Sequence, residues 1–276
     1  MRWFNRAALL AVIAVVAMTV APAFAQAPQP WQLGMQDPAT PVQDMLNSFH
    51  NELLVIITVI SLFVLGLLIV TMLKFRADRN PTPTRATHNT LLEILWTVVP
   101  IIILVVIAIP SFKLLYFGDR VAKADMTIKV TGHQWYWSYE YPDQDNIQFD
   151  SYMVQDSDLK PGQPRLLETD NRLVVPVDTN VRVLIAGTDV IHSWFIPSFG
   201  VQTYAMPGRT NETWFRASKA GVFYGQCNQI CGVNHAYMPI AIEVVSKEQF
   251  GRWLVDAKKK FAGTSSPTTL ALAESN

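Results

Sequence analysis

Uncharged apolar stretches are concentrated in the first 112 residues of the chain. The first covers residues 7–20, directly after Arg2 and Arg6, and Ala23-Phe24-Ala25 follows it. A basic start, an apolar run and small residues before a cut are typical of a secretory signal peptide. We therefore expect a signal peptide at residues 1–25, with an uncleaved anchor as the alternative.

Two later stretches are long enough to cross a membrane. Residues 53–73 carry no charge, and a bilayer core needs about 20 apolar residues. Residues 94–112 are also uncharged, although Pro100 and Pro110 interrupt them. Prolines are tolerated in such a span where neighbouring protein satisfies the freed backbone carbonyls. The pattern predicts a transmembrane helical hairpin over residues 41–117.

The segment before this hairpin has a different character. Residues 26–40 are rich in Pro and Gln and lack a periodic pattern, which predicts an extended leader. Thr40-Pro41-Val42-Gln43 then predicts a helix start, with Thr as the cap, Pro at the first helical position and Gln three residues after the cap.

Basic residues orient the hairpin. The chain has no Lys or Arg between Arg6 and Lys74, whereas the link between the spans carries one acid, Asp78, and four basic residues, Lys74, Arg76, Arg79 and Arg85. The positive-inside rule places this link in the cytoplasm. We therefore expect a bacterial inner (plasma) membrane protein whose C-terminal part lies in the periplasm.

From residue 125 onward the pattern changes to short alternating runs rich in Val, Ile and aromatic residues. Many short strands with frequent turns predict a sandwich or barrel. The expected strands are 126–131, 135–141, 147–152, 172–175, 181–186, 190–196, 212–217, 222–226 and 240–245. Ser246 caps a predicted amphipathic final helix, and residues 262–276 are expected to form a disordered tail.

Overall composition and net charge limit the class of protein but do not change the predicted order of elements. The 276 residues are 50% hydrophobic and have zero formal net charge. The length fits one or two domains, and neutrality argues against a general nucleic-acid binder.

The chemistry of the chain is concentrated in residues 226–239. Cys227 and Cys231 are the only cysteines, and His235 and Met238 follow them. Thiolate, imidazole and thioether together favour copper over hard cations. Two thiolates on one loop can bridge two metal ions, which suggests a binuclear centre. His192, in an apolar run, is the best candidate for a second imidazole.

Two simpler interpretations compete with a metal site. A cysteine pair in an exported protein is often a disulfide, and a histidine in an apolar strand is often a core residue. The cysteine pair alone would favour the disulfide. The cysteines, the following His and Met, and the upstream His-Ser-Trp together favour the metal. A metal would also protect reduced thiols in an oxidising compartment.

Residues 132–141, 190–197 and 224–239 resemble subunit II of the haem-copper cytochrome c oxidases, and the resemblance extends over about residues 53–253. It implies a cupredoxin-type Greek-key β-barrel over residues 118–261 that holds the binuclear copper centre CuA. The overall fold class would be a membrane-anchored all-β protein with a two-helix hairpin before the barrel. The implied copper ligands are His192, Cys227, the backbone carbonyl of Gln229, Cys231, His235 and Met238.

Gln229 departs from the family pattern. The family usually has Glu here, whose side chain helps bind magnesium at the boundary with subunit I. A neutral amide is a weaker ligand for a hard cation. The departure leaves the copper ligand intact, since that is a backbone atom, and puts the magnesium site in doubt.

The resemblance also implies how an electron arrives. The family places the Trp that matches Trp135 on the surface, where it receives the electron from cytochrome c. Trp137, in the same segment, is expected in the core. Six nearby carboxylates form a candidate docking patch for a basic partner, with a solvated loop face as the alternative: Glu140, Asp143, Asp145, Asp150, Asp156 and Asp158.

Glu93 has two interpretations. Thr90-Leu91-Leu92-Glu93 fits a capping box, and an acid in the first turn offsets the helix macrodipole. The resemblance instead implies a position near the entrance of a proton-uptake channel of subunit I. One residue could serve both roles.

The sequence thus predicts a subunit that accepts electrons from cytochrome c and passes them to the haem of subunit I, where oxygen is reduced with proton pumping. A quinol-oxidase subunit without copper is a rival, but the retained ligand set argues against it. A thioredoxin-like copper chaperone or thiol oxidoreductase needs βα alternation, whereas this pattern is all-β.

Overall fold

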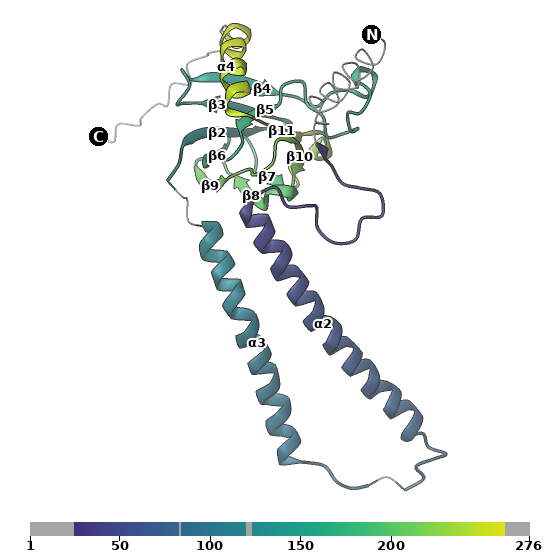
Figure 1. Ribbon diagram of the computed structural model, residues 1–276. Coiled ribbons are helices and arrows are strands. Elements are labelled where there is room, and N and C mark those ends of the chain that lie inside the picture. The colour runs from purple at the N-terminus through teal and green to yellow at the C-terminus, as the bar shows by residue number, and fades with distance from the viewer. Residues whose placement is uncertain (1–24, 83, 120–122, 263–276) are drawn as a thin grey trace, which may run out of the picture.

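The chain folds into a helical hairpin followed by a β domain (Figure 1), and the computed structural model describes residues 25–82, 84–119 and 123–262. The signal peptide expected at residues 1–25 lies outside this part of the chain except for Ala25. The expected tail lies outside it except for Ala262.

Two long helices form the hairpin. Helix α2 spans Pro41–Lys74 and helix α3 spans Thr90–Asp119. Both are long and apolar enough to cross a membrane. They leave the β domain close together and diverge toward the link between them (Figure 1). The spans expected at residues 53–73 and 94–112 lie within these two helices.

The helix starts follow local hydrogen-bonding rules. Thr40 caps α2 as predicted, because its hydroxyl accepts a hydrogen bond from the Gln43 amide at 3.2 Å and Pro41 takes the first position. The predicted cap of α3 at Thr90 is wrong by one residue. Asn89 is the cap: its Oδ1 accepts from the Leu92 amide at 3.2 Å, while Glu93 Oε1 accepts from the Asn89 amide at 3.3 Å.

The β domain has two sheets. One has the order β5-β11-β10-β7-β8, with β1 also paired to β10, and the other has the order β4-β3-β2-β6-β9. Their bounds are β1 Ala25–Gln26, β2 Met126–His133, β3 Tyr136–Tyr141, β4 Ile147–Ser151, β5 Leu173–Pro176, β6 Val181–Gly187, β7 His192–Ile196, β8 Val201–Ala205, β9 Asn211–Phe215, β10 Gly221–Cys227 and β11 Pro239–Val245. The inner faces of the two sheets share one core rich in aromatic side chains.

The final helix α4, Lys247–Phe261, packs against β4 and β5. Ser246 forms the predicted capping box, because its side chain and that of Gln249 each accept a hydrogen bond from the other's amide.

The hairpin is fixed to the β domain at both helix ends. Before α2, the Thr40 hydroxyl donates to the Phe199 carbonyl at 2.6 Å. At the end of α3, the Trp214 indole donates to the Gly118 carbonyl at 3.0 Å. The expected fold class, a helical hairpin followed by a cupredoxin-like β domain, is confirmed. Within the described residues the strands form two packed sheets, and an isolated bridge between Gly187 and Pro207 links them at one edge.

Candidate metal centre

The two segments with predicted metal ligands meet at one end of the β domain. The loop from Cys227 to Met238 joins β10 to β11, and His192 is the first residue of β7. Strand β7 pairs with the end of β10, where Trp194 lies opposite Cys227. The sheet register therefore brings a histidine and a cysteine 35 positions apart into one cluster.

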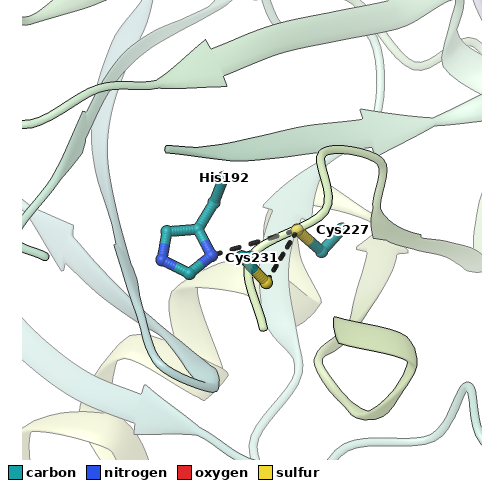
Figure 2. A group of neighbouring side chains, drawn as sticks. All are labelled: His192, Cys227 and Cys231. Atoms are coloured by element: carbon teal, nitrogen blue, oxygen red, sulfur yellow. Dashed lines mark hydrogen bonds between the residues drawn. The ribbon is translucent and has the colours of Figure 1, made fainter. Parts of the chain in front are cut away.

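The soft donor atoms converge (Figure 2). The ligand atoms of His192, Cys227 and Cys231 all lie within 4.8 Å of one another, and all three residues are buried. The Cys231 sulfur lies 3.6 Å from His235 Nδ1 and 3.6 Å from Met238 Sδ. The sixth predicted donor, the Gln229 carbonyl oxygen, lies 3.3 Å from the Cys227 sulfur.

The two thiols face each other without a covalent bond. Their sulfur atoms are 3.8 Å apart, whereas a disulfide bond is about 2.05 Å long. Burial would raise the pKa of Cys227, but contacts with His192 and backbone groups outweigh it and lower that pKa. Burial and the neighbouring Cys227 raise the pKa of Cys231. This donor set fits a soft, thiolate-binding metal such as copper.

Asp189 orients His192 through the ring nitrogen that faces away from the thiols. His192 Nδ1 lies 3.9 Å from the Cys227 sulfur, and Nε2 lies 2.8 Å from Asp189 Oδ1. The Asp189 carboxylate also accepts hydrogen bonds from the backbone amides of Val190 and Gln134, each at 2.6 Å. Partial burial would raise the pKa of Asp189, but these hydrogen bonds lower it below the usual value. The carboxylate is thus held ionised against the ring.

Trp137 supports two of the predicted ligands from inside the core. It is fully buried, as predicted. Its indole Nε1 donates to the Met238 carbonyl at 3.3 Å. Its ring meets the His192 imidazole edge to face, with centroids 6.0 Å apart.

Trp135 lies directly on the Cys227–Met238 loop and is half-buried. It belongs to the turn before β3, so the expected strand at residues 135–141 starts one residue later. Its indole nitrogen donates to the Cys231 carbonyl at 3.2 Å, and Gln134 Nε2 donates to the same oxygen at 2.8 Å. Gly232 has a φ of 126°, and a Cβ there would lie 2.9 Å from the Trp135 ring, so only glycine allows this approach.

The six carboxylates of the expected patch do not form one unpaired group. Glu140 pairs with Lys129 at 2.8 Å, Asp156 pairs with Arg165 at 2.7 Å, and Asp145 forms an ion pair with Lys258. Asp143 accepts from the Thr127 amide, and Asp158 accepts from the Ser157 hydroxyl. Asp150 accepts from the Ser138 hydroxyl.

Strand register separates these carboxylates in space. The pair His133 and Tyr136 marks the Trp135 end of β2 and β3, and Lys129 and Glu140 pair at the other end. Four residues of strand span about 13 Å. Glu140, and with it the turn that carries Asp143 and Asp145, therefore lies away from the metal centre.

Sequence reasoning missed Asp189 and Gln134 and assigned Trp137 only to the core. A signal existed for Asp189, since an acid three residues before a ligand histidine can reach that histidine's ring. The Gln134 contact depends on the turn between β2 and β3 and has no such signal. Glu93 does not belong to the metal centre. It lies in the first turn of α3, where its side chain accepts a hydrogen bond from the amide of the capping residue Asn89.

Comparison with known proteins gives two family matches. Residues 28–114 match the profile "Cytochrome C oxidase subunit II, transmembrane domain", and residues 126–245 match "Cytochrome C oxidase subunit II, periplasmic domain". Together they cover most of the chain.

Individual relatives agree with these matches. A protein of Rickettsia bellii named "Probable cytochrome c oxidase subunit 2" is 54% identical over 90% of this chain and 92% of its own length. The mitochondrial cytochrome c oxidase subunit 2 of Vigna unguiculata is 50% identical over 84% of this chain and 63% of its own length. A crystal structure of the periplasmic domain of subunit II (CoxB) of Bradyrhizobium japonicum is 57% identical, covers 51% of this chain and 99% of that chain, and superposes with a TM-score of 0.49.

Proposed function

Because this chain belongs to the cytochrome c oxidase subunit II family, we propose that it is the subunit through which electrons from cytochrome c enter a haem-copper oxidase of the bacterial inner membrane. One observation carries the proposal: six soft or carbonyl donor atoms from His192 and the Cys227–Met238 loop converge at one end of the β domain. The chain is a subunit of an oxidoreductase complex, and oxygen reduction is assigned to subunit I.

The proposed cofactor is a binuclear copper centre. The thiolates of Cys227 and Cys231, Nδ1 of His192 and of His235, the Met238 sulfur and the Gln229 carbonyl would hold the copper ions. Copper supplies a one-electron carrier when bound. The side chain of Gln229 is neutral, so we do not assign it the magnesium role of a carboxylate.

The surrounding residues hold these donors in place. Asp189 fixes the orientation of the His192 ring, and Trp137 holds the Met238 backbone. Outer contacts of this kind orient metal ligands and restrict their movement. A centre that moves little between redox states needs little reorganisation when an electron arrives.

Trp135 is the proposed point of electron arrival. Its indole is partly accessible to solvent. The indole N–H donates a hydrogen bond to the carbonyl of Cys231, so one hydrogen bond links this surface side chain to the backbone of a proposed copper ligand. The Asp189 carboxylate accepts a hydrogen bond from the Gln134 amide and is hydrogen-bonded to His192 Nε2, which ties this turn to the metal centre on a second side.

The proposed docking surface for cytochrome c is smaller than the sequence indicated. We assign it to Trp135, Asp150 and Asp189, because Asp150 lies opposite Ser138 near the Trp135 end of β3 and Asp189 contacts the Trp135 turn. Asp156 lines the same hollow as Trp135, although it is paired with Arg165. Glu140, Asp143 and Asp145 lie farther away and are engaged within the domain.

Stopped-flow reduction of the copper-loaded chain by a reduced basic cytochrome c tests this assignment. We expect Trp135→Phe to slow electron transfer at saturating donor. Asp150→Asn should lower the association rate and weaken its salt dependence. The matched control Asp145→Asn should leave both unchanged. Equal effects of the two Asp variants would contradict the docking assignment.

A further inference from the structure

The leader loop, residues 27–38 between β1 and α2, presents two large apolar side chains to the outside. Trp31 is 98% exposed and Leu33 is 97% exposed. No charged residue occurs from Gln26 to Gln36. Neither Trp31 nor Leu33 belongs to the core or to the metal centre, so the proposed function leaves both unexplained.

Both ends of this loop are fixed to the β domain. Upstream, Gln26 of β1, the first residue after the expected signal peptide, pairs with Phe223 of β10. Downstream, the Ala39 amide donates to the Ser198 carbonyl at 2.9 Å. Because its ends are fixed, the loop can hold side chains at a defined height relative to the helical hairpin.

The middle of the loop is a hydrogen-bonded turn. The Gln32 amide donates to the Gln29 carbonyl at 3.2 Å, and Gln32 Nε2 donates to the Met35 carbonyl at 3.0 Å. Trp31 has a φ of 60°, a left-handed conformation that is rare for a bulky residue. The turn thus keeps its polar groups bonded to one another while the indole points away.

The loop passes beside the first turns of α2 (Figure 1). Asn47 Nδ2 donates to the Gln36 carbonyl at 3.4 Å, so Gln36 lies level with the second turn of α2. Six residues separate Asn47 from Leu53, where the uncharged span begins, which is about 9 Å along the helix. The headgroup layer is about 5–8 Å thick on each side of the bilayer core. The three residues from Leu33 to Gln36 can span about 10 Å, so both apolar side chains can reach that layer.

We propose that the leader loop is an interfacial membrane anchor, in which Trp31 and Leu33 insert into the headgroup region of the outer leaflet. Tryptophan is enriched at this depth because its ring is apolar and its N–H finds a polar partner. The absence of charge removes the main cost of insertion. With two spanning helices on one side and this loop as another contact, the β domain would be held at a fixed tilt above the membrane. The proposal does not depend on copper.

The full-length chain in lipid nanodiscs allows a direct test. Wild-type and Trp31→Phe proteins are compared in phosphatidylcholine and in phosphatidylcholine brominated near the headgroup end of its acyl chains. The difference between the two emission spectra is the Trp31 contribution. We expect this contribution to be blue-shifted and to lose most of its intensity in the brominated lipid.

Two further variants calibrate the measurement. Trp96→Phe removes an exposed tryptophan of membrane-spanning α3, whose contribution should be quenched by bromines placed in the acyl region. Trp135→Phe removes a tryptophan of the β domain, whose contribution should be unaffected by lipid bromination.

Two results would overturn the anchor. In one, the Trp31 contribution resists brominated lipid and is quenched by acrylamide in the aqueous phase. In the other, lipid quenching occurs in the isolated chain and disappears in the assembled oxidase, which would show that another subunit covers the loop.

Discussion

The Asp189 carboxylate lies 2.8 Å from His192 Nε2 and also accepts hydrogen bonds from two backbone amides, one of them in the Trp135 turn. One side chain therefore connects a proposed copper ligand with the proposed electron-receiving turn. We expect Asp189→Asn to weaken copper binding by about 10–100-fold, the usual range for an outer-sphere partner of a metal-bound imidazole. It should also raise the copper reduction potential, because a nearby negative charge stabilises the oxidised centre. Copper titration and redox potentiometry measure the two effects.

A matched control separates this effect from general loss of surface charge. Asp143→Asn removes a carboxylate that accepts a backbone hydrogen bond away from the metal centre. An unchanged potential in Asp189→Asn, or an equal change in the control, would show that Asp189 does not act on His192.

Trp137 provides a second test of how the ligand loop is held. Trp137→Phe keeps an aromatic ring beside His192 but leaves the Met238 carbonyl without its indole donor. The Cys227 amide still donates to the Met238 carbonyl at 3.3 Å, so we expect the free energy of unfolding to fall by about 0.5–1.5 kcal/mol, the net contribution of one hydrogen bond, together with a change in the copper spectrum. Denaturant titration and electron paramagnetic resonance measure these quantities. Trp253→Phe in α4 is the control, since it should reduce stability without a spectral change.

Gly232 gives a prediction about the position of Trp135. Gly232→Ala places a methyl group 2.9 Å from the Trp135 ring, too close for ordinary contact, at a φ that side chains rarely adopt. We expect copper to bind while electron transfer from cytochrome c slows, because the indole moves from the Cys231 carbonyl. Stopped-flow rates checked against copper content would show this. A variant with normal rates would mean that the indole position is unimportant for electron arrival.

Much of the candidate metal centre could be predicted from the sequence, since the spacing of Cys227, Cys231, His235 and Met238 already indicated one soft-metal loop.

Strand β8 was missed because only its first and last residues, Val201 and Ala205, are buried, which leaves a weak alternating pattern. The pairing of the carboxylates in the expected docking patch could not be predicted, for a different reason. Whether Glu140 is free or paired with Lys129 depends on the β2 and β3 register, which residue order alone does not provide.

Glu168 makes the stability of the β domain sensitive to acid. Its side chain is fully buried, and it accepts hydrogen bonds from Arg172 at 2.7 Å and from the Tyr224 hydroxyl at 2.9 Å. Burial would raise the pKa of Glu168, but these partners lower it below its usual value. The stabilisation is therefore complete above the ordinary glutamate pKa and is lost as pH falls through the lowered folded value.

Denaturant unfolding as a function of pH measures this contribution. We expect Glu168→Gln to lower stability at neutral pH by about 1–3 kcal/mol and to flatten the acid dependence. Glu248→Gln, at the exposed start of α4, should leave the profile unchanged. An identical acid profile in Glu168→Gln and wild type would rule out this carboxylate as the source.

We propose that the converging donors hold a binuclear copper centre, and copper analysis with electron paramagnetic resonance on the purified, copper-loaded chain is the decisive measurement. We expect two coppers per chain that share one unpaired electron, with visible thiolate-to-copper absorption, and loss of this signal in Cys227→Ser and Cys231→Ser. A chain that takes up no copper under reducing conditions and recovers only a Cys227–Cys231 disulfide would contradict it.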